Sequence, residues 1–291
     1  MKKRLITGII LVLLLAPVIY FGNYFMAGLT LLLMILGLYE FYNVKKKAKL
    51  EKIPLYTYFI SLVFSYLMIF DIPIKGFPSF DYANGVLNVF NINIIWIILL
   101  AVSLFTSSIF DKKFKLNDVF YLFTTTMYLS LGLKGFLYLR SFGNNIGLFL
   151  ILYVLIVTCV TDMFAYFGGM TCYKLFGNDK VHKLNERISP KKTIEGTIVG
   201  TVFGTICGLV FALIAFKNTQ FGYPFYIYLI ISLVISICGQ IGDLLLSAIK
   251  RHFEIKDYSN ILPGHGGILD RFDSIILNCM ITAIIVSILL L

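Results

Sequence analysis

The residue types best suited to chemistry gather in one stretch near the C-terminal end of the chain, residues 247–273. It reads SAIKRHFEIKDYSNILPGHGGILDRFD, and Asp243 lies one helical turn before it. Its acids, bases and glycines stand against long apolar segments, where charge is costly. We therefore interpret the stretch as a site for metal and phosphate chemistry at a membrane surface. The alternative is a solvated loop with ordinary flanking charges.

Two acids from separate predicted helices indicate a metal site. Asp243 is expected near the end of one helix, and Asp270 and Asp273 at the start of the next. The residues expected on the same helix face as Asp243 are Ser247, Lys250 and Arg251, and Ser247 is predicted to bind substrate. Mg²⁺ typically takes one or two carboxylates and completes its shell with water and phosphate oxygens. We predict Asp243 and Asp270 as its ligands; an Asp–Lys ion pair that only fixes the helix is the alternative.

A glycine-rich loop, residues 263–267, lies between these two helices. Backbone N–H groups of such a loop can converge as an anion-binding nest just before a helix N-terminus. Gly266 and Gly267 are therefore predicted to bind substrate phosphate, with Arg271 in the turn that follows. His265 is predicted as a general acid or base, and a hydrogen-bonding loop residue is the alternative.

A second constellation is ISPKKTIEG, residues 188–196. Pro190 is expected to start a helix, which places Lys191 and Lys192 in the first turn beside free N–H groups. Cations at that position oppose the helix dipole, so an anion such as a triphosphate is the natural third partner. Ser189 and Thr193 add hydroxyl donors. The alternative is that the lysines only anchor the topology.

A third feature is Asp162 in VTCVTDMFAYFGG, near the inner end of an apolar segment. An acid within a membrane segment is a functional candidate by default. Asp162 is therefore predicted to bind substrate, and a stabilising hydrogen bond to a neighbouring helix is the alternative.

The elements that must position these residues are membrane helices. Hydrophobic residues make up 59% of the 291 and charged residues only 14%, where a soluble chain has about 25% charged. The prediction is an all-α polytopic membrane protein, with about five helices in an N-terminal region, residues 1–145, and a catalytic region, residues 146–291. The nine predicted spans are about 5–21, 25–43, 55–71, 92–110, 119–138, 146–168, 194–216, 223–245 and 268–291.

The distribution of basic residues predicts the orientation of these spans. With the N-terminus in the cytoplasm, 21 of the 25 Lys and Arg residues fall on the cytoplasmic side, as the positive-inside rule requires. Both motif-rich loops, 169–193 and 246–267, then lie on that side, and a site they share faces the cytoplasm from the cell membrane. The net charge of +10 is explained by anionic lipid headgroups, without nucleic acid.

Two further patterns have structural readings. Gly196, Gly200, Gly204 and Gly208 recur every four residues, which places a stripe of small residues on one helix face and permits close helix packing. The five cysteines are scattered singly, so neither disulfides nor zinc is indicated.

The stretch from Ser247 to Asp273 resembles the signature of the phosphatidate cytidylyltransferases, also called CDP-diacylglycerol synthases. It carries Ser-x-x-Lys-Arg, then Lys-Asp, Pro-Gly-His-Gly-Gly and Asp-Arg-x-Asp. DMFAYFGG and ISPKKTIEG resemble two further blocks of that family in the same order, so the resemblance covers residues 162–273. Residues 170–184 look longer than the family's usual link, which puts the roles of Lys174 and His182 in doubt.

The resemblance implies a reaction in which CTP and phosphatidate give CDP-diacylglycerol and pyrophosphate, with Mg²⁺ required. It implies metal binding at Asp243 and Asp270 and leaves a second metal ion open. Asp273 would belong to the catalytic set. The residues expected on the CTP phosphates are Ser189, Lys191, Lys192 and Thr193. Lys250 and Arg251 would hold phosphatidate or pyrophosphate, while the lipid tails stay in the bilayer.

Two other functions remain open from the residues. One is another CTP-using membrane lipid enzyme, such as a polyprenol or phytol kinase or an archaeal-type lipid cytidylyltransferase. The other is a transporter that uses the acids as a cation pathway. A homodimer is also left open.

Overall fold

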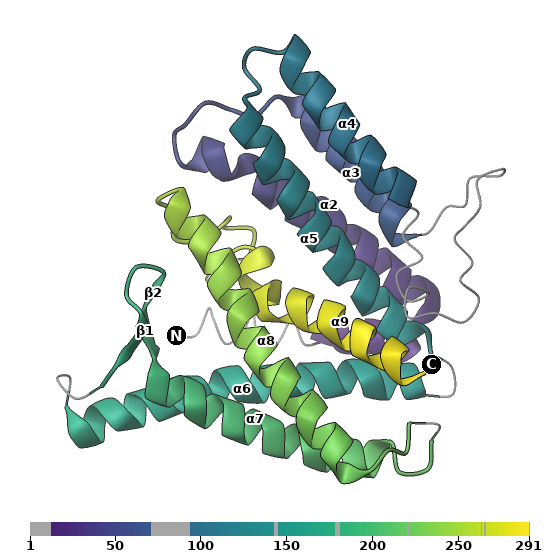
Figure 1. The fold of residues 1–291 in the computed structure, drawn as a ribbon, viewed down its shortest axis with the longest axis vertical. Helices are drawn as coiled ribbons and strands as arrows, with labels where there is room; N and C mark the ends of the chain where they lie inside the picture. The colour runs from purple at the N-terminus through teal and green to yellow at the C-terminus, as the bar shows by residue number, and fades with distance from the viewer. Residues whose placement is uncertain are drawn as a thin grey trace.

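The computed structural model describes residues 13–70, 94–142, 145–177, 181–219, 221–262, 264 and 266–290, and this part of the chain is mostly helical (Figure 1). The helices are α2 (Asn23–Lys47), α3 (Leu55–Ile69), α4 (Ile94–Phe110), α5 (Leu116–Ser141), α6 (Ile146–Phe176), α7 (Ile194–Ala215), α8 (Phe225–His252) and α9 (Leu269–Leu289). In Figure 1, α2 to α5 form one group and α6 and α7 lie side by side in the other, with α8 and α9 between them.

Five helices in the described residues are long and apolar enough to cross a membrane. They are Tyr24–Lys47, Ile146–Leu175, Ile194–Ala215, Phe225–His252 and Leu269–Leu289, and α3 and α4 are shorter apolar helices. The chain is therefore a mostly helical membrane protein, which agrees with the predicted all-α class. Residues 5–12 of the predicted span 5–21 lie outside the described residues.

The glycine stripe on α7 has the packing role predicted for it. All four of its glycines are buried against α6. A Cβ atom at Gly200 would lie 2.5 Å from the carbonyl oxygen of Thr161, and one at Gly196 would lie 2.5 Å from that of Ala165. Real Cβ contacts are not that short, so only glycine lets the two backbones approach this closely. This packing holds α7 beside the helix that carries Asp162.

The lysines of ISPKKTIEG lie on a β-hairpin, so the predicted helix start at Pro190 is wrong. β1 (Lys183–Asn185) pairs antiparallel with β2 (Ser189–Thr193), and α7 begins only at Ile194. The residue before a proline is biased toward extended backbone, and pairing with β1 gives the segment hydrogen-bond partners that a first helical turn lacks. Thr193 is the N-cap, and its hydroxyl accepts a hydrogen bond from the Gly196 N–H at 3.0 Å.

Two helices extend seven or more residues beyond their predicted ends. α8 continues to His252 where the prediction stopped near residue 245, and α6 reaches Phe176 where it stopped near 168. Asp243 and its predicted neighbours on one face therefore share the single helix α8. The last turn of α8 therefore carries the polar residues Lys250, Arg251 and His252.

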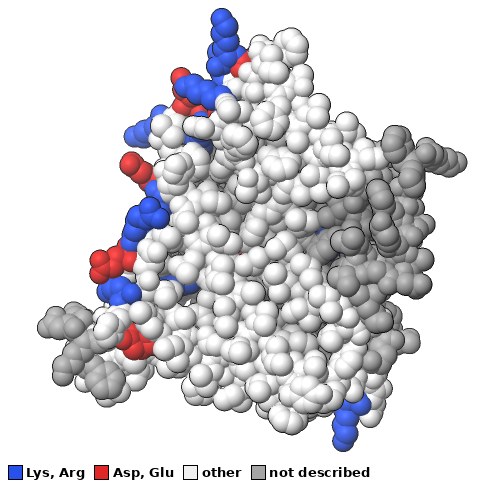
Figure 2. All heavy atoms as spheres, in the orientation of Figure 1, with Lys and Arg blue, Asp and Glu red and all other residues white. Residues whose placement is uncertain are grey.

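Charged side chains gather along one edge of the molecule. Figure 2 shows most of the visible Lys, Arg, Asp and Glu residues on the edge that in Figure 1 holds the β1–β2 hairpin. The rest of this face is almost free of charge. A charged edge beside an uncharged belt is the pattern expected of a protein embedded in a bilayer.

Candidate active site

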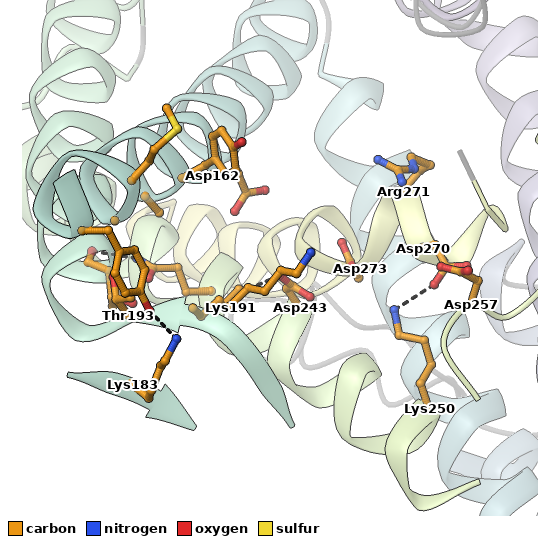
Figure 3. Close-up of a pocket in the computed structure, with 18 of the residues that line it drawn as sticks. Asp162, Lys183, Lys191, Thr193, Asp243, Lys250, Asp257, Asp270, Arg271 and Asp273 are labelled. Carbon is orange, nitrogen blue, oxygen red and sulfur yellow. Dashed lines mark hydrogen bonds and ion pairs between the residues drawn. The ribbon is translucent and has the colours of Figure 1, made fainter. Parts of the chain in front are cut away.

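A cavity of about 1050 Å³ opens where the hairpin meets α6, α8 and α9 (Figure 3). Ligand pockets typically measure about 300–1,000 Å³, so it has room for a nucleotide together with a phosphate headgroup. Six basic and five acidic side chains line it. The predicted site residues among its lining are Asp162, Lys191, Lys192, Thr193, Asp243, Lys250, Asp270, Arg271 and Asp273.

Strand β2 supplies the basic end of the cavity. Lys192 Nζ lies 2.6 Å from Asp243 Oδ2, so an ion pair joins the hairpin to α8. Lys191 is exposed, whereas Thr193 is buried at the junction with α7. Successive residues of a strand point to opposite sides, so the two lysines leave β2 in different directions.

Three carboxylates from three helices face the middle of the cavity. Asp162 on α6, Asp243 on α8 and Asp273 on α9 all line it. The Ser247 hydroxyl donates to Asp243 Oδ1 at 3.1 Å, and the Ser274 hydroxyl donates to Asp162 Oδ2 at 3.4 Å. In Figure 3, Asp243 and Asp273 lie between the β2 side and the Asp270 side. Such a cluster attracts cations.

Asp270 is held on the far side of this cluster by three donors. Lys250 Nζ donates to its Oδ1 at 2.8 Å, and the N–H groups of Tyr258 and Gly267 donate to its Oδ2 at 2.8 and 2.9 Å. Lys250 is itself buried, with 8% of its surface exposed. Breaking a buried ion pair by removing one partner costs several kcal/mol, so this pair is firmly placed.

Tyr258 packs behind the Lys250–Asp270 pair. Its hydroxyl donates to the Leu246 carbonyl oxygen at 3.0 Å, and Lys250 Nζ lies 5.5 Å from the centre of its ring. Burial, with smaller contributions from Tyr121 and Asp270, raises the pKa of the Tyr258 phenol well above its ordinary value. The phenol therefore stays protonated and acts as a hydrogen-bond donor.

The remaining predicted residues lie outside the cavity lining. The exposed Arg251 donates from Nε to the Ile188 carbonyl oxygen at 3.2 Å and from Nη1 to that of Ile255 at 3.0 Å, so it ties the hairpin to the end of α8. Ser189 begins β2, and Ser247 reaches the cavity only through Asp243. His265 lies outside the described residues.

The glycine loop has its N–H groups occupied by the protein's own acceptors. The Gly266 N–H donates to the Leu262 carbonyl oxygen at 3.1 Å, and the Gly267 N–H donates to Asp270. The next two N–H groups, of Ile268 and Leu269, donate to Glu40. Phosphate binding by Gly266 and Gly267 therefore stays a prediction, and it would require these bonds to be exchanged.

Sequence reasoning missed several residues that line the cavity. Gln240 lies one turn before Asp243 on α8 and donates from Nε2 to the Thr201 hydroxyl at 2.8 Å. The Lys183 ammonium of β1 bonds to the Tyr173 hydroxyl. A polar residue three positions before an intramembrane acid could have indicated Gln240. Nothing in the sequence pairs Lys183 with Tyr173, because the hairpin creates that contact.

The donor chemistry of the cavity fits Mg²⁺. Carboxylate oxygens are the protein ligands that Mg²⁺ prefers, and one or two suffice when phosphate oxygens complete the shell. Within the described residues, no group of three His, Cys, Asp or Glu side chains is close enough to hold a metal ion by itself. Asp243 and Asp270 both line the cavity, each paired with a lysine. Their assignment as ligands stays a prediction.

The chain is similar to known cytidylyltransferases over nearly its full length. The profile of the cytidylyltransferase family matches residues 2–289. The phosphatidate cytidylyltransferase of Bacillus subtilis is 33% identical over 274 residues, covering 94% of this chain and 93% of that protein. Those of Staphylococcus haemolyticus and Staphylococcus saprophyticus are 34% and 32% identical, each covering 94% of both chains. This chain therefore belongs to the cytidylyltransferase family.

Proposed function

We propose that this protein transfers CMP from CTP to phosphatidate, giving CDP-diacylglycerol and pyrophosphate. The observation that carries the proposal is the cavity, in which hairpin lysines, carboxylates and a buried lysine meet at the charged edge of a membrane protein. Family membership and the names of the relatives support the same reaction. CDP-diacylglycerol is the activated precursor for phospholipid synthesis.

The reaction needs positioning and charge neutralisation more than covalent chemistry by the protein. A phosphate oxygen of phosphatidate attacks the α-phosphorus of CTP, and the bond from that phosphorus to the bridging oxygen of the β-phosphate breaks. Pyrophosphate carries away the bonding electrons. The protein therefore has to hold two anions in line and balance their charge.

The β2 end of the cavity is the proposed site of the CTP phosphates. Lys191 and Lys192 supply positive charge, and Ser189 and Thr193 supply hydroxyl groups beside them. The Lys192–Asp243 ion pair holds this lysine in the cavity. A triphosphate would draw Lys192 away from Asp243 and free a carboxylate oxygen.

The opposite end is the proposed site of the phosphatidate headgroup. Lys250 and Arg271 line the cavity there, and Arg251 lies at the end of the same helix as Lys250. The apolar surfaces of the surrounding helices would remain in contact with the lipid tails. Asp162 and Asp273 complete the substrate-facing surface between the two ends.

Asp243 and Asp270 are the proposed holders of Mg²⁺, which would neutralise phosphate charge and favour departure of pyrophosphate. Asp273 lines the same cavity as Asp243 and is the carboxylate proposed for a second metal ion. Ser247 orients Asp243, and the N–H groups of Tyr258 and Gly267 orient Asp270. His265 is kept as a proposed general acid or base.

The proposed membrane arrangement has nine spans, the N-terminus in the cytoplasm and the cavity facing the cytoplasm. The 21 cytoplasmic basic residues and the charged edge of Figure 2 support it. We also propose an N-terminal region of residues 1–145, a catalytic region of residues 146–291, and assembly as a homodimer.

Labelled CTP tests the reaction and separates it from its alternatives. Purified protein in detergent is given phosphatidate, Mg²⁺ and CTP carrying ³²P at either the α or the γ position. We expect label in the lipid only from α-labelled CTP, together with labelled pyrophosphate from γ-labelled CTP. Label in the lipid from the γ position would indicate a lipid kinase. Ion flux in liposomes without CTP turnover would indicate a transporter.

A further inference from the structure

Glu40 of α2 reaches from the N-terminal half of the chain to the turn that carries Asp270. Its Oε1 accepts hydrogen bonds from the Ile268 N–H at 2.8 Å and from the Ser259 hydroxyl at 2.5 Å, and its Oε2 accepts one from the Leu269 N–H at 2.8 Å. Only 1% of its surface is exposed. A carboxylate this buried is costly unless its hydrogen bonds are made, and all three donors come from residues more than 200 positions away.

Helix α2 also contacts other residues of the loop between α8 and α9. Phe41, next to Glu40, packs its ring edge-on against Tyr258, with the ring centres 5.5 Å apart. Lys47, two turns further along α2, donates from Nζ to the Asp257 carbonyl oxygen at 2.5 Å. Helix α2 thus contacts the loop at residues 257–259 and again at the start of α9. The loop that presents Asp270 is held against α2 at both ends.

Glu40 and Asp270 divide the N-terminal N–H groups of α9 between them. Gly267 donates to Asp270, while Ile268 and Leu269 donate to Glu40. Free N–H groups at a helix N-terminus attract the nearest carboxylate. Asp270 already accepts from the neighbouring Gly267 N–H, so without Glu40 we expect it to turn toward Ile268 and Leu269 and away from Lys250. Glu40 therefore leaves Asp270 available to the cavity.

Gly267 shows how closely Glu40 is fitted to this turn. A Cβ atom at Gly267 would lie 2.5 Å from Glu40 Oε1, and one at Gly266 would lie 3.0 Å from Asp270 Oδ2. Gly266 also has a φ of +87°, a conformation that side-chain-bearing residues rarely adopt. The two glycines thus leave the space that the two carboxylates fill.

We infer that Glu40 is a positioning residue that keeps the Asp270 carboxylate turned toward Lys250 and the cavity. It acts through the N–H groups of α9, and its hydrogen-bond partners Ser259, Ile268 and Leu269 are not among the described residues that line the cavity. The kinetic part of its test rests on the proposed function, whereas the amide-exchange part does not.

The test compares Glu40→Gln with Asp118→Asn. The amide keeps one acceptor oxygen but turns an NH₂ group against a backbone N–H. Asp118 is the matched control because it is another buried carboxylate, 3% exposed. It forms an ion pair with Lys45 and accepts a hydrogen bond from the Lys115 N–H, both within the N-terminal half. Hydrogen–deuterium exchange, Tm, kcat and the KM for CTP are measured on detergent-purified proteins.

We expect Glu40→Gln to speed amide exchange in residues 259–272 by at least about tenfold while residues of α6 and α7 keep their rate. We expect kcat to fall at least about tenfold with the KM for CTP changed less than about twofold. Asp118→Asn should lower Tm and leave kcat per folded molecule unchanged. Unchanged exchange in residues 259–272, or a kcat loss no greater than that of Asp118→Asn, would overturn the inference.

A second variant keeps the test usable if Glu40→Gln does not fold. Gly267→Ala places a Cβ atom against the Glu40 carboxylate. Its effect is measured with Glu40 present and in a Glu40→Ala background. If the Glu40→Ala protein does not fold, Ser259→Ala is used instead, because it removes one of the three donors to Glu40. We expect Gly267→Ala to lower kcat when Glu40 is present and to add little once Glu40 is truncated. Equal losses in both backgrounds, or full kcat in Ser259→Ala, would contradict the role of Glu40.

Discussion

The charged residues of the cavity are paired across elements, and the pairs differ in burial. Lys192 and Asp243 join the hairpin to α8 at 2.6 Å, with about a quarter of each side chain exposed. Lys250 and Asp270 join α8 to α9 at 2.8 Å and are almost wholly buried. The first pair is open enough to be exchanged for substrate, whereas the second is more costly to break.

Truncating either hairpin lysine should weaken CTP binding. We expect Lys191→Ala and Lys192→Ala each to raise the KM for CTP by roughly 10- to 150-fold, the equivalent of a charge-assisted hydrogen bond of about 1.5–3 kcal/mol. The KM for phosphatidate should change less. Lys256→Ala is the control, since Lys256 is exposed in the loop after α8 and does not line the cavity. An unchanged KM for CTP in both variants would mean that the lysines only fix the orientation of the chain in the membrane.

Neutralising either proposed metal ligand should nearly abolish turnover. Asp243→Asn and Asp270→Asn each replace a carboxylate with an amide that binds Mg²⁺ poorly, and the double variant should be little worse than either one because the two act as a unit. Lipid cytidylylation is measured across a Mg²⁺ titration, with Tm on the same samples. Substantial activity in either single variant at ordinary Mg²⁺ would defeat the assignment.

The ion pairs add a stability difference to this experiment. Asp270→Asn leaves the buried Lys250 without its carboxylate, so it should lower Tm more than Asp243→Asn, whose partner Lys192 is partly exposed. Asp111→Asn serves as the control, because Asp111 lies in the turn after α4 and bonds to Tyr56. Activity lost only in proportion to folded protein would mean that the acids are structural.

At the scale of elements, α6 and α7 form a closely packed pair that fixes the base of the hairpin. Thr193 caps α7 at the point where β2 ends, so the strand that carries Lys191 and Lys192 leaves directly from this pair. Any change that separates the two helices would therefore also displace the hairpin from α8.

A methyl group in the α6–α7 contact tests this coupling. Gly200→Ala would force a Cβ atom into the Thr161 carbonyl oxygen, and overpacking of this kind costs about 1–3 kcal/mol. We expect a lower Tm together with a higher KM for CTP. Gly28→Ala on α2 is the matched control, because a Cβ atom there has no neighbour within 4 Å. Equal Tm values for the two variants would show that α6 and α7 accommodate the added methyl group without loss of stability.

At the scale of the whole molecule, the site is assembled at one edge of a membrane protein from both halves of the chain. The C-terminal half supplies the cavity lining, and α2 supplies Glu40 and Lys47 behind it. Charge on this edge and its scarcity on the rest of the visible face point to a cavity at the membrane surface (Figure 2).

Cysteine labelling tests the side of the membrane on which that edge lies. In a cysteine-free background, single cysteines at Arg187 and Lys256 should resist an impermeant thiol reagent in intact cells and react after permeabilisation. A cysteine at Lys217, exposed between α7 and α8, should react in intact cells because the positive-inside rule places it outside. Strong labelling at Arg187 or Lys256 in intact cells would overturn the cytoplasmic site.

The sequence by itself determined the class, the helices and nine of the 19 residues that line the cavity. Long apolar runs predict membrane helices because unpaired backbone groups are too costly in lipid, and eight predicted spans overlap α2 to α9. Helical periodicity placed Asp243, Ser247 and Lys250 on one face, since that relation is local. The glycine stripe predicted close packing for the same reason.

Tertiary structure alone decided which charges meet. Helical periodicity cannot say that Lys192 faces Asp243 or that Lys250 faces Asp270, because these contacts depend on how separate helices pack. The predicted helix start at Pro190 also placed Lys191 and Lys192 wrongly in a helix. The pairing that makes β2 comes from β1 and not from local propensity. In the sequence, Glu40 is a single acid in an apolar run. Only the fold brings it to α9, 229 residues away, where buried N–H groups need an acceptor.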